Sequence, residues 1–182
     1  EILNAMIDSM TVVGDKVTKN EIFVPEMLVA ARAMQKGVEV LKPLLVGDNA
    51  VSAGKMIMGT VAGDLHDIGK NLVIMMLESA GFEVIDLGVD VPAEKFIQAL
   101  EENPDVKIVG ASALLTTTMP ALKDTVKALN EYPGRDKIKV MVGGAPITQE
   151  FADEIGADAY TEDAASAAQV AKKLATSVSV PA

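Results

Sequence analysis

Residues 55–71 read KMIMGTVAGDLHDIGKN, and this stretch decides the fold. The apolar run at 56–62 predicts a buried strand, and the residues from 69 onward have helical spacing. Between them lies a short polar loop that contains the only histidine of the 182 residues. A buried strand that leads through a loop into a helix is the repeating unit of an α/β fold.

The same unit recurs along the chain. Strands are predicted at 56–62, 83–87, 107–113 and 138–142, with a weaker one at 157–160. Helices are predicted at 69–80, 93–103, 119–131, 148–155 and 163–176. This alternation predicts an α/β fold with a flavodoxin-like, doubly wound, five-stranded parallel sheet of strand order 2-1-3-4-5.

The first part of the chain has a different pattern. Apolar residues at helical spacing between Ile2 and Leu45 predict two helices, with Pro25 near the start of the second. The small, polar stretch VGDNAVSAG predicts a linker. We therefore divide the chain into a helical cap at 1–46, a linker at 47–54 and an α/β domain at 55–182.

Composition narrows the functional classes. The net charge of −10 and the lack of a Lys/Arg cluster argue against a nucleic-acid partner. The absence of cysteine excludes thiolate metal sites and disulfides and suits a reducing cytoplasm. No apolar run is long enough for a membrane span. These features predict a cytoplasmic globular protein with no nucleic-acid and no membrane partner.

Three loops follow the carboxyl ends of strands, which lie at the same edge of a parallel sheet, so they meet at one rim. Ligands of such sheets bind at this edge. GDLHDIGK follows the first strand, SALLTTT the third and GGAP the fourth. The lone histidine, a Ser/Thr cluster and a glycine pair are therefore expected around one crevice.

Common site chemistries do not fit these loops. A phosphate loop fails because Asp64 replaces its first glycine and Asn71 its Ser/Thr. No G-x-G-x-x-G follows a strand, and structural zinc needs more His and Cys than the chain has. A Ser112–His66 nucleophile is conceivable, but the serine lacks the G-x-S-x-G elbow.

What remains is a histidine with a carboxylate two residues before it. In an extended loop Asp64 and His66 lie on the same side, so the carboxylate can accept from one ring nitrogen while the other faces outward. Such a carboxylate fixes the tautomer and raises the basicity of the outward nitrogen. This arrangement suits a metal that brings its other ligands with it, as in a macrocycle.

These residues match a known pattern. The chain resembles the cobalamin-binding module of methionine synthase and the corrinoid proteins of methanol, methylamine and methoxy-aromatic methyltransferase systems. The family motif D-x-H-x-x-G corresponds to Asp64, His66 and Gly69, S-x-L to Ser112 and Leu114, and G-G to Gly143 and Gly144. The blocks are separated by 42 and 28 residues, as counted between Gly69 and Ser112 and between Leu114 and Gly143.

The resemblance implies a corrinoid methyl carrier with the cofactor, cobalamin or a related cobamide, bound base-off/His-on. Cobalt would cycle between Co(I) and methyl-Co(III), with His66 as the metal ligand, Asp64 bonded to its ring, Ser112 bonded to Asp64, and the glycine pair lining the channel of the nucleotide tail. Tyr160 would close this channel. Asp64, His66 and Ser112 are the implied catalytic residues, and Asp67 equally suits a helix start. The implied cofactor-binding residues are Gly63, Asp64, Leu65, His66, Asp67, Ile68, Gly69, Ser112, Leu114, Thr116, Thr117, Gly143, Gly144, Ala145, Tyr160, Val17 and Val24.

The cap should cover the upper face of the corrinoid through Val17 and Val24. The family cap has about four helices and only two are readable here, so the chain is either a fragment or is completed by a partner. Met6, Met10, Met27 and Met34 would then leave apolar surface for a homodimer. The implied partners are a substrate-specific methyltransferase and a second methyltransferase that accepts the methyl group.

Two other functions remain open at this stage. One is the cobalamin subunit of an adenosylcobalamin-dependent mutase, and the other is a cobalamin sensor or storage module. The helical segment before the sheet favours methyl transfer, because the mutase module normally lacks it.

Overall fold

The computed structural model describes residues 2–41 and 53–177. Two helices come first, α1 (Ile2–Thr18) and α2 (Val24–Leu41). The strands are β1 (Gly54–Thr60), β2 (Phe82–Asp86), β3 (Val106–Ser112), β4 (Lys139–Gly143) and β5 (Ala159–Tyr160). The later helices are α3 (Ile68–Ser79), α4 (Ala93–Glu102), α5 (Met119–Asn130), α6 (Gln149–Ile155) and α7 (Ala164–Ser177), with 3₁₀ turns at Thr116–Thr118 and Arg135–Lys137.

The sheet is parallel throughout, and its strand order is β2-β1-β3-β4-β5. The predicted fold class and strand order are therefore confirmed. Boundaries differ by one or two residues: β1 begins at Gly54 because its backbone already pairs with Phe82 there, although neither Gly54 nor Lys55 belongs to the apolar run.

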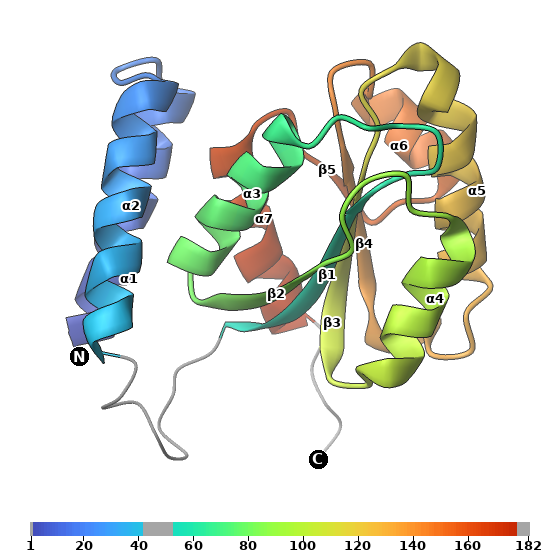
Figure 1. Ribbon diagram of the computed structural model, residues 1–182, viewed down its shortest axis with the longest axis horizontal. Helices are drawn as coiled ribbons and strands as arrows, with labels where there is room; N and C mark the ends of the chain where they lie inside the picture. Colours follow the sequence, from blue (N-terminus) through green and yellow to red (C-terminus); the bar gives the residue numbers. More distant parts are fainter. Residues whose placement is uncertain (1, 42–52, 178–182) are drawn as a thin grey trace.

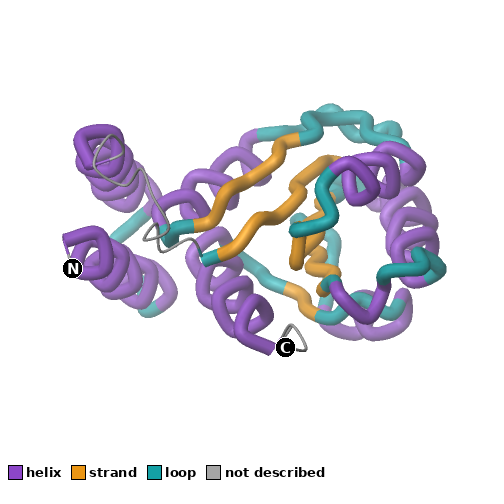
Figure 2. The backbone as a smooth tube through the Cα atoms, turned by 90° about the horizontal axis from the view of Figure 1, so that it is seen from below, coloured by secondary structure: helices purple, strands orange, loops and turns teal. Residues whose placement is uncertain are grey.

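Four layers follow from left to right in Figure 1: the cap, α3 with α7, the sheet, and α4 with α5 and α6. Figure 2, seen from below, shows the helices on both faces of the sheet and the cap as a separate pair beyond one face. Side chains alternate along each strand. On β1, Met56 and Met58 belong to the core beside α3 and α7, whereas Ile57 belongs to the core beside α4 and α5.

The cap packs on the α3–α7 layer through its methionines. Met10, Met27 and Met34 are buried, and they share one core with Met56, Met58 and alanines of α7. The expectation that the cap methionines leave apolar surface for a homodimer is wrong for these three, since the α/β domain covers them. The homodimer itself stays a prediction without this support.

The predicted linker at 47–54 lies mostly outside the described residues, and its last residue, Gly54, already belongs to β1. Among the residues that the structure describes, no helix combines the length and apolarity that a bilayer crossing requires.

Candidate functional site

The loop after β1 is fastened to its neighbours at the carboxyl edge of the sheet. Val61 N–H donates to the Ser112 carbonyl at 3.0 Å, so the chain leaves β1 beside the end of β3. Gly63 has a positive φ of 78°, which turns the chain, and its N–H donates to Asp90 Oδ1 at 2.7 Å. The Asp90 N–H in turn donates to the Asp64 carbonyl at 2.9 Å. The loop that carries the histidine is thus held by backbone contacts from two sides.

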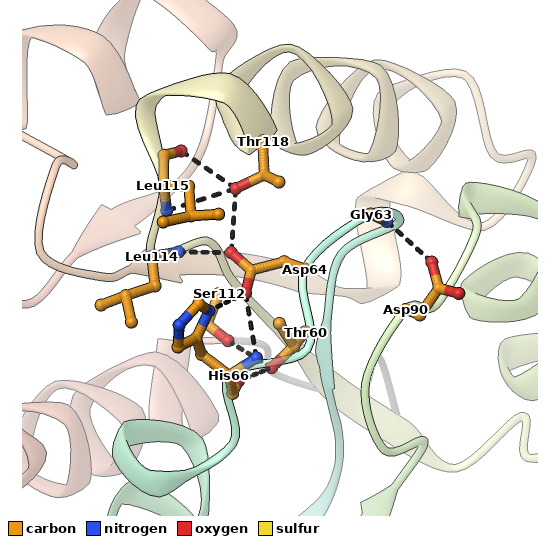
Figure 3. Close-up of polar contacts among 9 residues, drawn as sticks. All are labelled: Thr60, Gly63, Asp64, His66, Asp90, Ser112, Leu114, Leu115 and Thr118. Atoms are coloured by element: carbon orange, nitrogen blue, oxygen red, sulfur yellow. Dashed lines mark hydrogen bonds and ion pairs between the residues drawn. The ribbon is translucent and has the colours of Figure 1, made fainter.

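Asp64 is the centre of the site (Figure 3). Its side chain is fully buried and accepts four hydrogen bonds. Oδ1 accepts from the His66 N–H at 3.0 Å and pairs with His66 Nδ1 at 2.8 Å. Oδ2 accepts from the Leu114 N–H at 2.6 Å and from Thr118 Oγ1 at 2.8 Å. Each carboxylate oxygen is therefore held by one backbone and one side-chain donor.

These bonds keep Asp64 ionised. Burial by itself would raise the pKa of the carboxyl group, since a buried charge loses its hydration. The four hydrogen bonds act in the opposite direction and outweigh burial, so the pKa lies well below its usual range. An ionised Asp64 only accepts hydrogen bonds, which places the proton of a neutral His66 ring on Nδ1.

The outward nitrogen of His66 is left for a ligand. The side chain is 51% exposed and borders a cavity of about 640 Å³. Within the described part of the chain, Nε2 makes no hydrogen bond, so its lone pair is available. The described residues contain no cluster of three or more His, Cys, Asp or Glu that could hold a free metal ion. The protein thus offers a metal one ligand here, and a macrocycle would supply the others.

The cavity runs from the rim into the space between the sheet and the α3–α7 layer. Its inner wall is apolar, with Met58, Gly110 and Met141 from the strands, Leu77 from α3 and Ala165 from α7. A Cβ at Gly110 would meet the Met58 sulfur, so a larger residue there would require this flexible side chain to move. A cavity of this volume is in the ~300–1,000 Å³ range of small-molecule sites.

Most of the predicted site residues border this cavity. They are Val17, Val24, Leu65, His66, Asp67, Ile68, Gly69, Ser112, Leu114, Gly143, Gly144 and Ala145. Gly63, Asp64, Thr116 and Thr117 lie near it without lining it: Asp64 sits beneath the ring, and Thr116 and Thr117 are exposed on the turn before α5. The three predicted loops therefore meet at one rim, together with the start of α2.

Two of the motif glycines, Gly69 and Gly144, have different surroundings. Gly144 has a φ of +130°, and a Cβ there would collide with the Ala113 carbonyl, so the protein itself requires glycine. A Cβ at Gly69 would meet nothing within 4 Å, although this residue lies in the first turn of α3, where alanine is more favourable. Gly69 lines the cavity, so the space beside it is open to a ligand.

The expected partner of Ser112 needs correction. Ser112 Oγ pairs with Thr60 Oγ1 at 2.9 Å, and the hydroxyl that reaches Asp64 belongs to Thr118. The physical reason is the register of the sheet: Thr60 and Ser112 are partners on adjacent parallel strands, so their side chains point to the same side. Thr118 was missed because it follows two other threonines in a stretch that reads as a polar turn.

Tyr160 also differs from its expected place. It packs against the core beside α4 and α5 and does not line the cavity. Alternation along β5 explains this, because the next residue, Thr161, faces the cavity instead, followed by Glu162 and Asp163. Lys70 is a further cavity residue that sequence reasoning missed; its Nζ is bound by Asp86 at 2.7 and 2.8 Å.

Comparison with known families agrees with this geometry. Residues 54–169 match the B12 binding domain family, and residues 1–42 match a second family with the same description. The chain belongs to the B12-binding domain family. The cofactor of this B12-binding protein is therefore a corrinoid, and the cavity, the free His66 nitrogen and the open wall at Gly69 fit it.

Relatives with known roles cover most of the B12-binding chain. It is 50% identical over 167 residues to dimethylamine corrinoid protein 3 of Methanosarcina mazei, which corresponds to 91% of this chain and 99% of that protein. A cobalamin-binding protein from Desulfitobacterium hafniense matches with 34% identity and a TM-score of 0.82, over 94% of this chain and 80% of that chain. The methanol:cobalamin methyltransferase complex from Methanosarcina barkeri matches with 34% identity and a TM-score of 0.80, over 95% of this chain and 66% of that chain.

Proposed function

We propose that this chain is the methyl carrier of a corrinoid-dependent methylamine methyltransferase system and that His66 binds cobalt base-off/His-on. The observation that carries the proposal is the ionised, buried Asp64 that holds His66 Nδ1 at 2.8 Å and leaves Nε2 free beside the cavity. When bound, the corrinoid supplies a cobalt centre that accepts and donates a methyl group while cycling between Co(I) and Co(III).

The residues of the chain have distinct tasks in this proposal. Asp64 fixes the ring so that Nε2 presents its lone pair to the metal. Gly69 keeps the cavity wall free of side-chain atoms where the macrocycle would bind. Gly143 and Gly144 border the entrance to the apolar part of the cavity, which takes the nucleotide tail. Val17 and Val24 reach the same cavity from the cap and would cover the upper face of the corrinoid.

The chain supplies no methyl-transfer chemistry of its own beyond holding the cofactor. We infer that a substrate-specific methyltransferase loads it and that a second methyltransferase accepts the methyl group. Dimethylamine is the methyl donor that the name of the Methanosarcina mazei relative supports. The match of residues 1–42 to a B12 binding domain family supports methyl transfer over the mutase alternative, whose module normally lacks a cap. We also propose that the protein acts in the cytoplasm, in keeping with its lack of cysteine.

A single histidine makes the test unambiguous. In the Co(II) form, an axial nitrogen splits the electron paramagnetic resonance lines. Protein labelled with ¹⁵N only at histidine should change each triplet to a doublet relative to unlabelled protein, and His66→Ala should abolish this coupling. A splitting that does not respond to the label would show that the lower base of the cofactor stays on cobalt, which would refute the His-on proposal. A chain that takes up no corrinoid would refute the carrier function as a whole.

A further inference from the structure

The inner wall of the cavity contains one row of residues that runs across the sheet. Met58 on β1, Gly110 on β3 and Met141 on β4 are register partners, and all three border the cavity. We call these three residues the floor row. Two residues nearer the carboxyl edge, Ser112 and Gly143 are again partners, and they point to the same side because strand residues alternate. The hydroxyl and the motif glycine thus lie toward the rim, and the floor row below them has no polar side chain.

The polar side chains that border the cavity lie away from the floor row or are already bonded. The Lys70 ammonium, at the first turn of α3, is held by Asp86 and Asn71, and Ser112 Oγ pairs with Thr60 Oγ1. The others belong to the loops at the carboxyl edge of the sheet: His66, Asp67, Thr161, Glu162 and Asp163. The inner part of the cavity therefore offers a ligand apolar contacts and no charge.

The backbone and the buried atoms of this inner part offer no hydrogen bond either. β3 lies between β1 and β4, so the N–H and carbonyl groups around Gly110 belong to the ladder. Buried polar groups are normally paired, so an unpaired one in the wall would indicate a polar ligand. Among the described residues, the buried side-chain atom without a hydrogen bond is Ser79 Oγ, and Ser79 does not border the cavity. The wall thus holds no group in reserve for a polar ligand.

The shape of the floor row suits a flat ring. A Cβ at Gly110 would meet the Met58 sulfur, so this thioether lies over the glycine. Methionine has three rotatable bonds and a polarisable sulfur that packs favourably against aromatic rings. A glycine inside a strand is typical of a place where a ligand approaches the backbone closely. An aromatic ring that displaces the Met58 side chain would lie against Gly110, with a thioether on either side.

We propose that the floor row selects the lower base of the cobamide and takes a base with an apolar edge, such as dimethylbenzimidazole, in preference to a purine. This inference rests on the proposed function, in which the nucleotide tail enters the cavity. A purine such as adenine carries an amino group and additional ring nitrogens that water satisfies in solution. Against the floor row these groups would be buried without partners, which lowers affinity.

The first test compares cobamides that differ in their lower base. The cofactor-free protein is titrated with cobalamin and with the cobamide that carries adenine, and formation of the His-on form is followed by absorption. Because the two bases also hold cobalt with different strength in the free cofactor, the base-on equilibrium of each free cobamide is measured by acid titration and subtracted. The corrected affinity for cobalamin should be higher by about 10-fold or more, which is ~1.4 kcal/mol and lies within the cost of one unpaired buried polar group.

Met141→Gln tests the residues of the floor row. It replaces a thioether by an amide of similar length that can pair with the amino group of adenine, so the preference for cobalamin should narrow. Met34→Gln is the matched control, because Met34 is 5% exposed but lies in the cap and does not border the cavity. A preference that is unchanged in Met141→Gln, or that narrows as much in Met34→Gln, would overturn the role of the floor row. The comparison of the two cobamides on the wild type tests the proposal even where a variant does not fold.

Gly110→Ala places the base at the floor row independently of its chemistry. It should weaken binding of cobalamin and leave binding of cobinamide, a corrinoid without the nucleotide tail, unchanged. An equal loss for both corrinoids, or no loss for cobalamin, would show that the tail does not lie against Gly110.

The same titrations separate this inference from the proposed function. If the wild type forms the His-on species equally well with both cobamides after the correction, base selection is wrong and the proposed function stands. If the wild type binds no corrinoid, the proposed function fails and this inference fails with it.

Discussion

Asp64→Asn is the most informative perturbation of the site, because it preserves the shape of the side chain while removing its charge and one of its two accepting oxygens. The carboxylate accepts four hydrogen bonds, two at each oxygen, and the amide keeps just one accepting oxygen. Whichever way the amide turns, its NH₂ group faces one backbone N–H, from either His66 or Leu114. The side-chain donor beside it can adapt, since the Thr118 hydroxyl can turn toward the Leu115 carbonyl and the ring can change its tautomer.

The magnitude follows from the one donor that cannot adapt. A buried backbone N–H without an acceptor costs about 1–3 kcal/mol. The remaining bonds weaken as well, because bonds to a charged group contribute ~1.5–3 kcal/mol and neutral ones ~0.5–1.5 kcal/mol, although the neutral amide is easier to bury. We expect Asp64→Asn to lower the free energy of unfolding by about 2 kcal/mol, within the range of that single unsatisfied N–H.

Urea denaturation followed by circular dichroism measures this change in the cofactor-free protein. Asp153→Asn is the control: it removes the same charge from an exposed position on α6, where the carboxylate accepts a hydrogen bond from the Gln149 amide, and it should leave stability unchanged. The ¹⁵N signals of the single histidine ring should report, in the same sample, a larger share of the Nε2-protonated tautomer, which cannot bind a metal through Nε2. Wild-type stability combined with wild-type ring signals would refute the argument that the four donors require a carboxylate.

Three further predictions concern other parts of the site. Asp86→Ala should destabilise the chain by about 3–5 kcal/mol, because the Lys70 ammonium is 2% exposed and would keep Asn71 as its remaining acceptor among the described residues. Lys70→Met should cost less, since Asp86 is 42% exposed and still accepts from the Gly88 N–H. A denaturation experiment in which Lys70→Met is the less stable variant would contradict this prediction. Gly69→Ala should leave the melting temperature of the cofactor-free protein unchanged or higher while weakening corrinoid binding, whereas Gly144→Ala should prevent stable folding. Thermal unfolding and corrinoid titration measure these effects. Unimpaired corrinoid binding by Gly69→Ala would show that the ligand does not require this glycine. The pKa of Tyr160 is raised, first by burial and then by nearby glutamates, so its phenolate absorbance should appear at higher pH in the folded than in the denatured protein. The stability from this group should be present below the pKa of the unfolded state and lost as pH rises through the pKa of the folded state. Tyr160→Phe should remove the late part of the absorbance titration, and an unchanged titration curve would count against the assignment.

The fold could be predicted from sequence because each strand except the last contains a short apolar run, at 56–58, 84–85, 108–109 and 140–142. Such runs are typical of parallel strands covered on both faces, and their alternation with helices leaves few topologies. The short β5 was the weakest part of the prediction: only Ala159 and Tyr160 pair with β4. Before them, Asp158 accepts from Arg135 and from the Val140 N–H, so the edge is fixed by polar contacts that carry no apolar signal.

The site could be predicted as far as backbone topology determines it. Strand order brings the three loops to one rim, and the Asp64–His66 spacing places carboxylate and ring together. The identity of the hydroxyl that reaches Asp64 lay beyond this reasoning. It depends on the register that pairs Thr60 with Ser112 and on the 3₁₀ turn at Thr116–Thr118, which brings Thr118 over the loop, and neither leaves a periodic pattern in the sequence.

The contacts that hold the loop and the ring of His66 explain how a single histidine can be positioned without a ligand. A lone imidazole on a loop would sample many orientations, and fixing them on ligand binding would cost conformational entropy. Here Asp90 holds the Asp64 backbone, Thr60 holds the His66 backbone and Asp64 holds the ring, each through a contact that exists without a ligand. The ring is therefore ordered in the absence of a ligand, while Leu65 and Ile68 on either side of it are 71% and 84% exposed and are open to contact with a cofactor or a partner.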